Sequence, residues 1–531
     1  MMRRTGLILA LLIATGTANA ANWTVTQSGP SGVGSFTWAL TQANAADATE
    51  QQIIEFDLPI GQRRIRPLVA SPWPSINHPD VIIDGGEPSD LFSSDRITLE
   101  AVRGNGFTFA NTLLHVGPDA RRLKLRDLSV ISGFGRGLGN CLNAQLARAD
   151  IQIEIDRVTF AFCQSQGNAI DGTGAFGGAI FSVGGLTIRD SLFYRNEANT
   201  GDQLGIVPPN SVSAAGGAIA IYYGTVLIQR TGFIENKVLS NEHQAWGGAI
   251  AFLSAEAGYL TIIDSHFQSN SIERVSAIAQ NLSRIGGAIH SLAAKTHINR
   301  SSFVDNSALA GGALAASNAG AGGQTTAEFK IENSLIASNT AELDGGGVYF
   351  DWPGLRYSQR NATFVDNDLV SGIRGRHMAI RAGSLLQTSH SIIFGDSGTA
   401  GVASSCEFEP GVVPIDASVG NSLSIEEGSF QSCSAAGAFP VADNDAIGLS
   451  PAGPISTAIG NQYWPLVAGG LAIDGGAAGA PSDSDWSRCS PSDVLGTARP
   501  VDGDGNGSAR CDIGSFEYRI PEAPIFANGF D

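Results

Sequence analysis

The sequence predicts an all-β protein built as a stack of parallel coils, and three recurring motifs lead to this prediction. A Gly-Gly segment, usually continued by Ala-Ile, is followed by an Ile-rich strand and then by a Phe with an Asn three residues later. Motifs that return in this order every 25 to 39 residues are typical of a stacked repeat architecture. The glycine pairs are expected to begin at Gly177, Gly216, Gly247, Gly286, Gly311 and Gly346.

Each repeat carries apolar residues at fixed distances before its aromatic residue. The aromatic column reads Val130, Phe160, Phe193, Phe233, Phe267, Phe303, Ile336, Phe364 and Ile393. Five residues earlier the column is Leu125, Ile155, Ile188, Ile228, Ile262, Ile298 and Ile331, and two residues before that it is again mostly apolar. A spacing of two predicts a strand with one buried face. The odd spacing of five then predicts a bend between two strands.

The predicted bend carries alternating charges from one repeat to the next. The column three residues before the aromatic reads Asp127, Arg157, Asp190, Arg230, Asp264, Arg300, Asn333, Asn361 and His390. If coils lie about 4.8 Å apart, opposite charges face one another, whereas like charges in register would repel. The alternation therefore supports coil-on-coil stacking. A catalytic role for Asp190, Arg230, Asp264 and Arg300 is the alternative.

An asparagine follows each aromatic residue by three positions. The column is Asn196, Asn236, Asn270, Asn306, Asn339 and Asn367. Asn tolerates a left-handed backbone, and stacked amides can hydrogen-bond to the next coil. We expect a structural ladder rather than a ligand site. The glycine pairs are expected to form tight corners, because Gly permits positive φ and close backbone approach.

The N-terminus has the pattern of an export signal. Arg3 and Arg4 precede an apolar stretch from Leu7 to Ala14, and Ala18-Asn19-Ala20 provides a small-residue cleavage site. We expect cleavage after Ala20 and no transmembrane segment thereafter. The full chain has 50 acidic and 32 basic residues and a formal charge of −18. Such a surface disfavours nucleic acid and strongly anionic polysaccharides.

Six cysteines in an exported chain indicate disulfides. Fifteen pairings are formally open. Pairing between sequence neighbours predicts Cys141–Cys163, Cys406–Cys433 and Cys489–Cys511.

Two further groups of motifs resemble known bacterial families. The Gly-Gly-Ala-Ile and Phe-x-x-Asn motifs resemble polymorphic outer-membrane-protein repeats, which implies a right-handed parallel β-helix. The segments Leu471–Gly476, Arg499–Gly505 and Cys511–Glu517 are similar to the choice-of-anchor type C-terminal region. The expected organisation is a signal peptide (1–20), an N-terminal β-helix cap (21–115), parallel β-helix repeats (116–400), a disulfide-linked C-terminal cap region of β structure (401–520) and a tail (521–531).

One segment has the oxygen spacing of a calcium loop. Asp502-x-Asp504-x-Asn506-Gly507 places side-chain oxygens at alternate positions, and Asp512 lies near. The twelfth position is Ile513, where an EF-hand has a bidentate Glu. We expect these four polar residues to be either Ca²⁺ ligands or parts of a polar turn closed by Cys489–Cys511.

The sequence favours binding over catalysis. It lacks the zinc-binding and nucleophile-turn motifs and the Asp-Asp and Gly-His-Gly signatures expected of β-helix hydrolases. Aromatics beside the glycine corners, with insertions at 199–215, 237–246 and 272–285, could contact a polysaccharide or a cell-surface protein: Tyr222, Tyr223, Trp246, Tyr349, Trp352 and Tyr357. The expectation is a secreted or surface-exposed adhesin of a Gram-negative-type bacterium. The alternatives are a polysaccharide lyase or glycoside hydrolase, and an inert scaffold.

Overall fold

The structure is a computed structural model. It describes residues 20–521 apart from 69–71, 87–89, 102–111, 168–172, 201–212, 241–243, 254–257, 275–283, 318–326, 373, 382–383, 395–403, 410–411, 415–421, 426–432, 434–437, 442–443, 458–459 and 478. The predicted signal peptide up to residue 19, the tail from 522 and most of the predicted insertions therefore lie outside the described residues.

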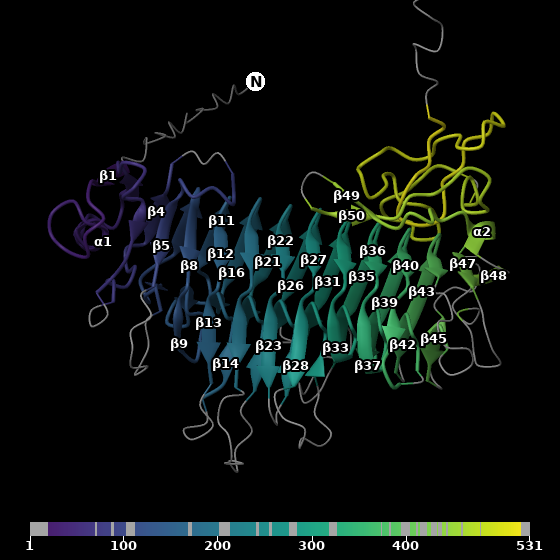
Figure 1. Cartoon of the computed structure of the whole chain (residues 1–531), viewed down its shortest axis with the longest axis horizontal. Helices are drawn as coiled ribbons and strands as arrows, with labels where there is room; N and C mark the ends of the chain where they lie inside the picture. Colours follow the sequence, from purple (N-terminus) through teal and green to yellow (C-terminus); the bar gives the residue numbers. More distant parts are fainter. Residues whose placement is uncertain are drawn as a thin grey trace, which may run out of the picture.

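The chain forms a parallel β-helix, as predicted, with four long sheets that run along its axis (Figure 1). The Ile strands build a sheet of thirteen, called here the Ile sheet. Its strands, in order, are β1 (Ala20–Val25), β2 (Gln51–Phe56), β4 (Asp80–Asp84), β7 (Arg122–Arg126), β11 (Gln152–Asp156), β16 (Gly185–Arg189), β21 (Thr225–Gln229), β26 (Tyr259–Ile263), β31 (Lys295–Asn299), β35 (Glu328–Glu332), β39 (Arg356–Arg360), β43 (Leu385–Ser389) and β46 (Val413–Pro414).

The aromatic residues stand on a second thirteen-stranded sheet, the Phe sheet. It consists of β3 (Arg64–Ile65), β5 (Ile97–Glu100), β8 (Leu128–Ile131), β12 (Thr159–Ala161), β17 (Leu192–Tyr194), β22 (Gly232–Ile234), β27 (His266–Gln268), β32 (Ser302–Val304), β36 (Leu335–Ala337), β40 (Thr363–Val365), β44 (Ile392–Phe394), β47 (Ser422–Ile425) and β48 (Ala438–Val441).

Two more sheets complete each turn. The third sheet holds β9 (Phe134–Arg136), β13 (Gln164–Gln166), β18 (Glu197–Asn199), β23 (Lys237–Ser240), β28 (Ser271–Arg274), β33 (Ser307–Ala310), β37 (Thr340–Asp344), β41 (Asp368–Leu369), β14 (Ala175–Phe176), β19 (Ala214–Ala215), β24 (Ala245–Trp246) and β29 (Arg284–Ile285). The sheet after the glycine corners, the Gly sheet, holds β6 (Leu114–His115), β10 (Leu142–Ala144), β15 (Ile180–Ser182), β20 (Ile219–Ile221), β25 (Ile250–Phe252), β30 (Ile289–Ser291), β34 (Leu314–Ser317), β38 (Val348–Asp351), β42 (Met378–Ile380) and β45 (Cys406–Phe408).

The residue columns predicted from the sequence match the strand register seen in the structure. Ile155 pairs with Ile188, and Phe160 pairs with Phe193 on the next coil. The rings of Phe160, Phe193, Phe233, Phe267 and Phe303 stack with centroids 4.7–5.1 Å apart, and all five are fully buried. This stack and the Ile column beside it form one continuous core, because each coil covers the apolar face of its neighbour.

Each coil turns through residues with a left-handed backbone. In one coil these are Asp190, Arg195 and Gly216, with φ of 49°, 51° and 64°. The bend after the aromatic therefore uses the residue before the asparagine, rather than the asparagine as expected. The last of the predicted glycine corners begins at Gly345, one residue before the predicted Gly346, because Leu314 pairs with Val348 and so aligns Gly311 with Gly345.

The asparagine column forms the expected ladder. Asn270 Oδ1 accepts hydrogen bonds from the backbone N and from Nδ2 of Asn236, both at 3.0 Å. Its own Nδ2 donates to Phe233 O and to Asn306 Oδ1, both at 2.9 Å. The same contacts repeat from Asn196 to Asn339. Buried amides thus satisfy buried backbone groups on neighbouring coils.

The parallel β-helix extends past both ends of the predicted repeats. Strands β1, β2 and β4 continue the Ile sheet before residue 116, and β45 to β48 continue three sheets after residue 400. Helix α1 (Phe36–Ala45), which the sequence reading did not predict, packs on β1 and β2, and Ser35 Oγ caps it by accepting from Trp38 N. It covers a sheet end that would otherwise offer unpaired backbone groups.

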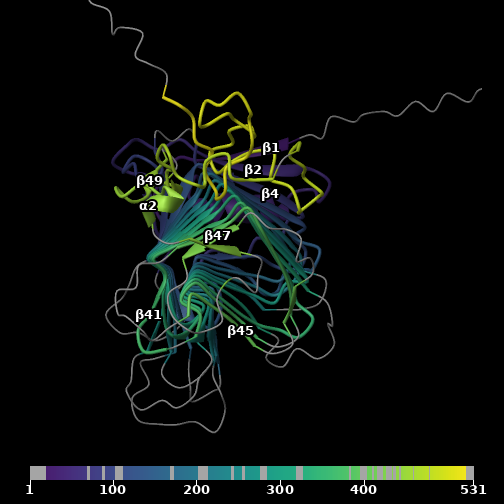
Figure 2. The same ribbon diagram turned by 90° about the vertical axis from the view of Figure 1, so that its right-hand side faces the viewer.

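Residues 444–521, called here the C-terminal module, pack against one side of the coil (Figures 1 and 2). They contain α2 (Asn444–Ile447) and a hairpin of β49 (Ile455–Ser456) and β50 (Gln462–Tyr463), and are otherwise mostly turns. The β structure expected over residues 401–520 lies mainly in β45 to β48. The three disulfides join Cys141 to Cys163, Cys406 to Cys433 and Cys489 to Cys511, the pairs expected from the sequence. Among the described residues, no helix has the length and apolar character needed to cross a membrane.

Candidate functional site

The alternating charges form three ion pairs between adjacent coils. Arg157 binds Asp127, Arg230 binds Asp190 and Arg300 binds Asp264, each through two N–H···O bonds of 2.6–2.9 Å. The Asp127 carboxylate, whose partner is Arg157, is also the most buried of the three acids. Each carboxylate thus has both oxygens engaged by one guanidinium, an arrangement that holds register.

The column of alternating charges ends after Arg300, where the C-terminal module buries the bend between the Ile sheet and the Phe sheet. Asn333, Asn361 and His390 are fully buried under it. Asn361 Oδ1 accepts from Ser490 N, and Asn361 Nδ2 donates to Asp512 O and Gly514 O. Neutral amides can satisfy a buried backbone at this place, whereas an unpaired charge would be costly there.

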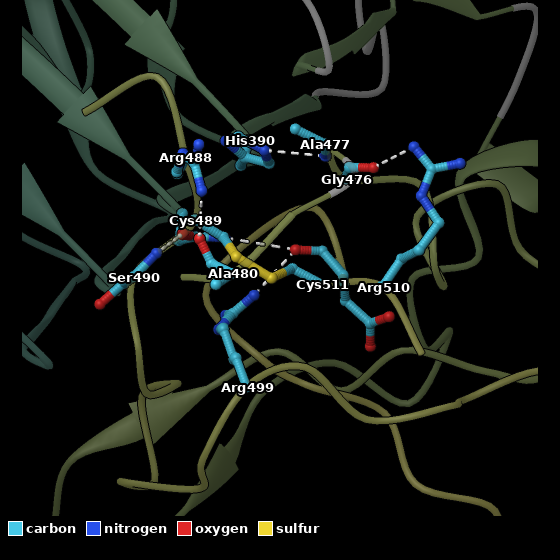
Figure 3. Close-up of a disulfide and its surroundings, with 12 residues drawn as sticks. His390, Gly476, Ala477, Ala480, Arg488, Cys489, Ser490, Arg499, Arg510 and Cys511 are labelled. Carbon is cyan, nitrogen blue, oxygen red and sulfur yellow. Dashed lines mark hydrogen bonds between the residues drawn. A yellow bond between two sulfur atoms is a disulfide. The ribbon is translucent and has the colours of Figure 1, made fainter. Parts of the chain in front are cut away.

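His390 contacts an irregular segment of the module beside the Cys489–Cys511 disulfide (Figure 3). Its Nε2 accepts from Ala477 N at 3.0 Å, which requires a ring unprotonated at that atom. Burial, and then the nearby charges of Arg499 and Arg360, lower the pKa of His390 to about 4. The ring therefore stays neutral at physiological pH and acts as a docking contact.

The predicted ligand-contact aromatics separate into three environments. Trp352 and Tyr357 are 0% exposed, so their assignment as ligand contacts is wrong. Both belong to the main core, because their side chains point inward after the glycine corner. Tyr222 and Tyr223 remain candidates, with 43% and 37% of their surface exposed and ring centroids 4.7 Å apart. Tyr259, which the sequence reading missed, is 43% exposed, and its strand β26 pairs with β21, which follows those tyrosines.

Trp246 and Tyr349 are half-buried on the outer side of the glycine corners. Trp246 stacks on the ring of His290 at 5.8 Å, and both aromatics pack against a small apolar cluster. The Arg381 guanidinium lies 5.6 Å from the Tyr349 ring centroid. These contacts occupy their faces with protein rather than leaving them as open stacking platforms.

The predicted calcium loop has a different set of neighbouring carboxylates. Asp502 and Asp504 lie with Asp474, and one oxygen from each is within 4.8 Å of the others. Asp474 was missed because it is about thirty residues away in sequence. The Asn506 side chain contacts Asp504 Oδ2 and the backbone N of Ser508.

Asp512, the fourth predicted ligand, does not join this cluster. Its two oxygens accept from Asp474 N and Tyr518 N. Burial, and next the neighbouring charge of Glu517, raise the pKa of Asp512 to about 7. Arg499 lies 3.0 Å from Glu517 in the same buried cluster. Asp512 therefore belongs to the interior of the module, so its assignment as a ligand is corrected.

A groove that the sequence reading missed lies on the bend between the Phe sheet and the third sheet. It has a volume of about 440 Å³, within the range of small-ligand sites. It crosses four successive coils, and its lining comprises Phe162, Cys163, Gln164, Arg195, Glu197, Glu235, Lys237, Ser269, Ser271 and Glu273. These residues flank the inward-pointing Cys163 and the asparagines of the ladder, so the rigid ladder fixes their backbone.

The centre of the groove is a network of paired charges. Arg195 lies 2.6 Å from Glu235, and Lys237 lies 3.3 Å from Glu197. Glu197 also accepts from Gln164 Nε2 and Asn199 Nδ2. At one end Phe162 is 42% exposed and meets Tyr194 edge to face at 5.5 Å. The groove therefore offers donors, acceptors and an aromatic surface side by side.

Acids from three adjacent coils line this groove, namely Glu197, Glu235 and Glu273. The signal for them was in the sequence: they stand two, four or six residues after the aromatic column, and Glu197 and Glu235 are adjacent to the asparagine column. No family model matches this chain, and neither a curated protein nor a solved structure matches it. Any functional conclusion therefore depends on the residues described above.

Proposed function

We propose that this protein binds a polysaccharide in the groove between the Phe sheet and the third sheet, without cleaving it. The observation that carries the proposal is a groove that spans several coils and is lined by donors, acceptors and an aromatic ring. Polar groups placed precisely beside an apolar surface are the usual means of ligand recognition. Rigid coils beneath them would reduce the entropy lost on binding.

The ion pairs favour binding over the alternative of a glycoside hydrolase. A glycosidase needs one carboxyl group that holds a proton and a second that acts as base or nucleophile. Glu235 and Glu197 are instead each paired with a base, Arg195 and Lys237, so neither carboxylate is free to act as a catalytic acid or base. The third acid, Glu273, contacts Ser271 Oγ at 3.0 Å.

The proposal extends to the setting of the protein. Its coils would be polymorphic outer-membrane-protein-type repeats, and it would act after export, as an adhesin on an outer cell surface. The exposed Tyr222 and Tyr223 support a second candidate, adhesion to a cell-surface protein, because exposed aromatics are enriched where partners bind. Calcium held by Asp474, Asp502 and Asp504 would have a structural role in the C-terminal module.

Retention on a panel of insoluble and gel-embedded polysaccharides tests the function. We expect retention of the wild type and loss of retention for the double variant Arg195→Ala/Glu235→Ala. The matched control is Arg148→Ala/Asp150→Ala, which removes an exposed ion pair of 2.8 Å outside the groove. Release of new reducing ends or unsaturated uronates by purified protein would show that the protein cleaves the polysaccharide, which would contradict a function of binding alone. Retention of no polysaccharide would contradict the proposal.

A further inference from the structure

The four central side chains of the groove alternate in charge in two directions. Along the helix axis Arg195 is followed by Glu235, and Glu197 is followed by Lys237, in each case on the next coil. Within a coil Arg195 precedes Glu197 by two residues, and Glu235 precedes Lys237 by two. Because Asn196 and Asn236 between them are buried in the ladder, the flanking side chains point outward and line the groove.

This alternation of the four charges in two directions, called here the charge checkerboard, discriminates between classes of ligand. A ligand anion beside Arg195 or Lys237 also lies beside a glutamate, and a ligand cation beside either glutamate also lies beside a base. Attraction and repulsion therefore largely cancel for a charged ligand. A hydroxyl group both donates and accepts, so a polyhydroxyl ligand can donate to the glutamates and accept from Arg195 and Lys237. Such bonds to ionised groups are stronger than bonds between neutral groups.

The ends of the groove suit the same ligand. Phe162 exposes part of its ring, and Tyr194 beside it carries the Arg195 guanidinium 4.9 Å from its centroid. A sugar ring has a face rich in C–H groups that can pack on such a surface. Ser269 and Ser271 at the far end add hydroxyls. Coils about 4.8 Å apart supply these features in sequence along the axis.

We infer that the groove selects a neutral, polyhydroxylated oligosaccharide chain lying along the helix axis over the coils of Phe162 to Ser271. The charge checkerboard determines this selectivity, and Phe162 forms the apolar end. This inference rests on the proposed function and names the substrate class of the same groove.

Binding of neutral, anionic and cationic polysaccharides to the wild type, measured at low and high salt, separates the inference from the function. We expect neutral chains to bind, with an affinity that changes less than threefold between 50 and 500 mM salt, because an uncharged ligand has no net charge for the salt to screen. No binding of any polysaccharide would overturn the proposed function itself. Binding of anionic or cationic chains alone would overturn this inference and leave the function standing.

A charge-swap variant tests the checkerboard directly. Arg195→Glu/Glu235→Arg keeps an ion pair along the axis but gives the two central groove side chains of each coil the same charge. We expect at least a tenfold loss of affinity for the neutral chain. The matched control Arg148→Asp/Asp150→Arg should bind as the wild type does. Wild-type affinity of the swapped variant would overturn the inference.

A second variant keeps the test valid if the swapped protein fails to fold. Phe162→Ala removes an exposed ring from a bend, with little effect expected on folding. Its affinity for the neutral chain should fall roughly fivefold. Unchanged affinity would contradict the role given to the apolar end.

Discussion

The asparagine ladder should supply a large, localised share of the stability of the helix, and Asn270→Ala tests this. Asn270 is fully buried, and its side chain makes four hydrogen bonds to Asn236, Phe233 and Asn306. Its removal leaves the Asn236 backbone N–H and the Phe233 carbonyl without these partners. An orphaned buried group costs about 1–3 kcal/mol. We therefore expect a loss of roughly 3–5 kcal/mol in the free energy of unfolding.

Equilibrium urea unfolding followed by circular dichroism measures this loss. The isosteric Asn270→Asp should lose at least as much at neutral pH, because carboxylate oxygens would then face Phe233 O and Asn306 Oδ1. Its deficit should shrink in acid, where the carboxyl group is protonated. Asn22→Ala, at an exposed position on β1, is the control and should change stability by less than about 0.5 kcal/mol. A loss below about 1 kcal/mol for both Asn270 variants would refute this account of the ladder.

Three further predictions concern the C-terminal module and the aromatics. Because the pKa of His390 is lowered to about 4 in the fold, the wild type should lose stability relative to His390→Gln between pH 6.5 and 4, by on the order of 3 kcal/mol; parallel pH curves would contradict this. Calcium should raise the Tm of the wild type and of the control Asp483→Asn but not that of Asp504→Asn. An equal rise in all three proteins would mean that calcium binds at a site that does not include Asp504. Trp352→Ala should lower the free energy of unfolding by about 3–5 kcal/mol, whereas Tyr222→Ala should alter it by less than about 0.5 kcal/mol. Calorimetry and urea unfolding measure both changes. Similar losses for the two variants would contradict the assignment of Trp352 to the core and of Tyr222 to the surface.

The central coils could be predicted from the sequence because one residue type occupies one environment in every turn. Phe193 and Phe233 stack directly, so residues at the same position of the sequence motif are also in contact in the structure. The outer coils lack this signal. Strand β3 has two residues, and β48 carries Phe439 with no asparagine three positions later, so short-range patterns could not align them. Their position is decided by pairing with strands already in place.

The candidate site was harder to predict for two physical reasons. The glycine corner marks where Trp352 lies but does not say that its ring points inward, since inward and outward positions both follow the same corner. The groove residues Arg195 and Glu235 vary in type from coil to coil, and their pairing needs the coil register. Asp474 reaches Asp502 through the fold of the module, which no local spacing encodes.

The three arginine–aspartate pairs impose a rule of parity on the length of the helix. Removing one coil between Asp127 and Arg300 would bring two like charges into register, whereas removing two adjacent coils would restore an acid opposite a base. Duplications and deletions in this segment should therefore be tolerated in even numbers. Past Arg300 the bend residues are neutral, so that constraint ends, and the reach of the C-terminal module limits how many coils can be added there.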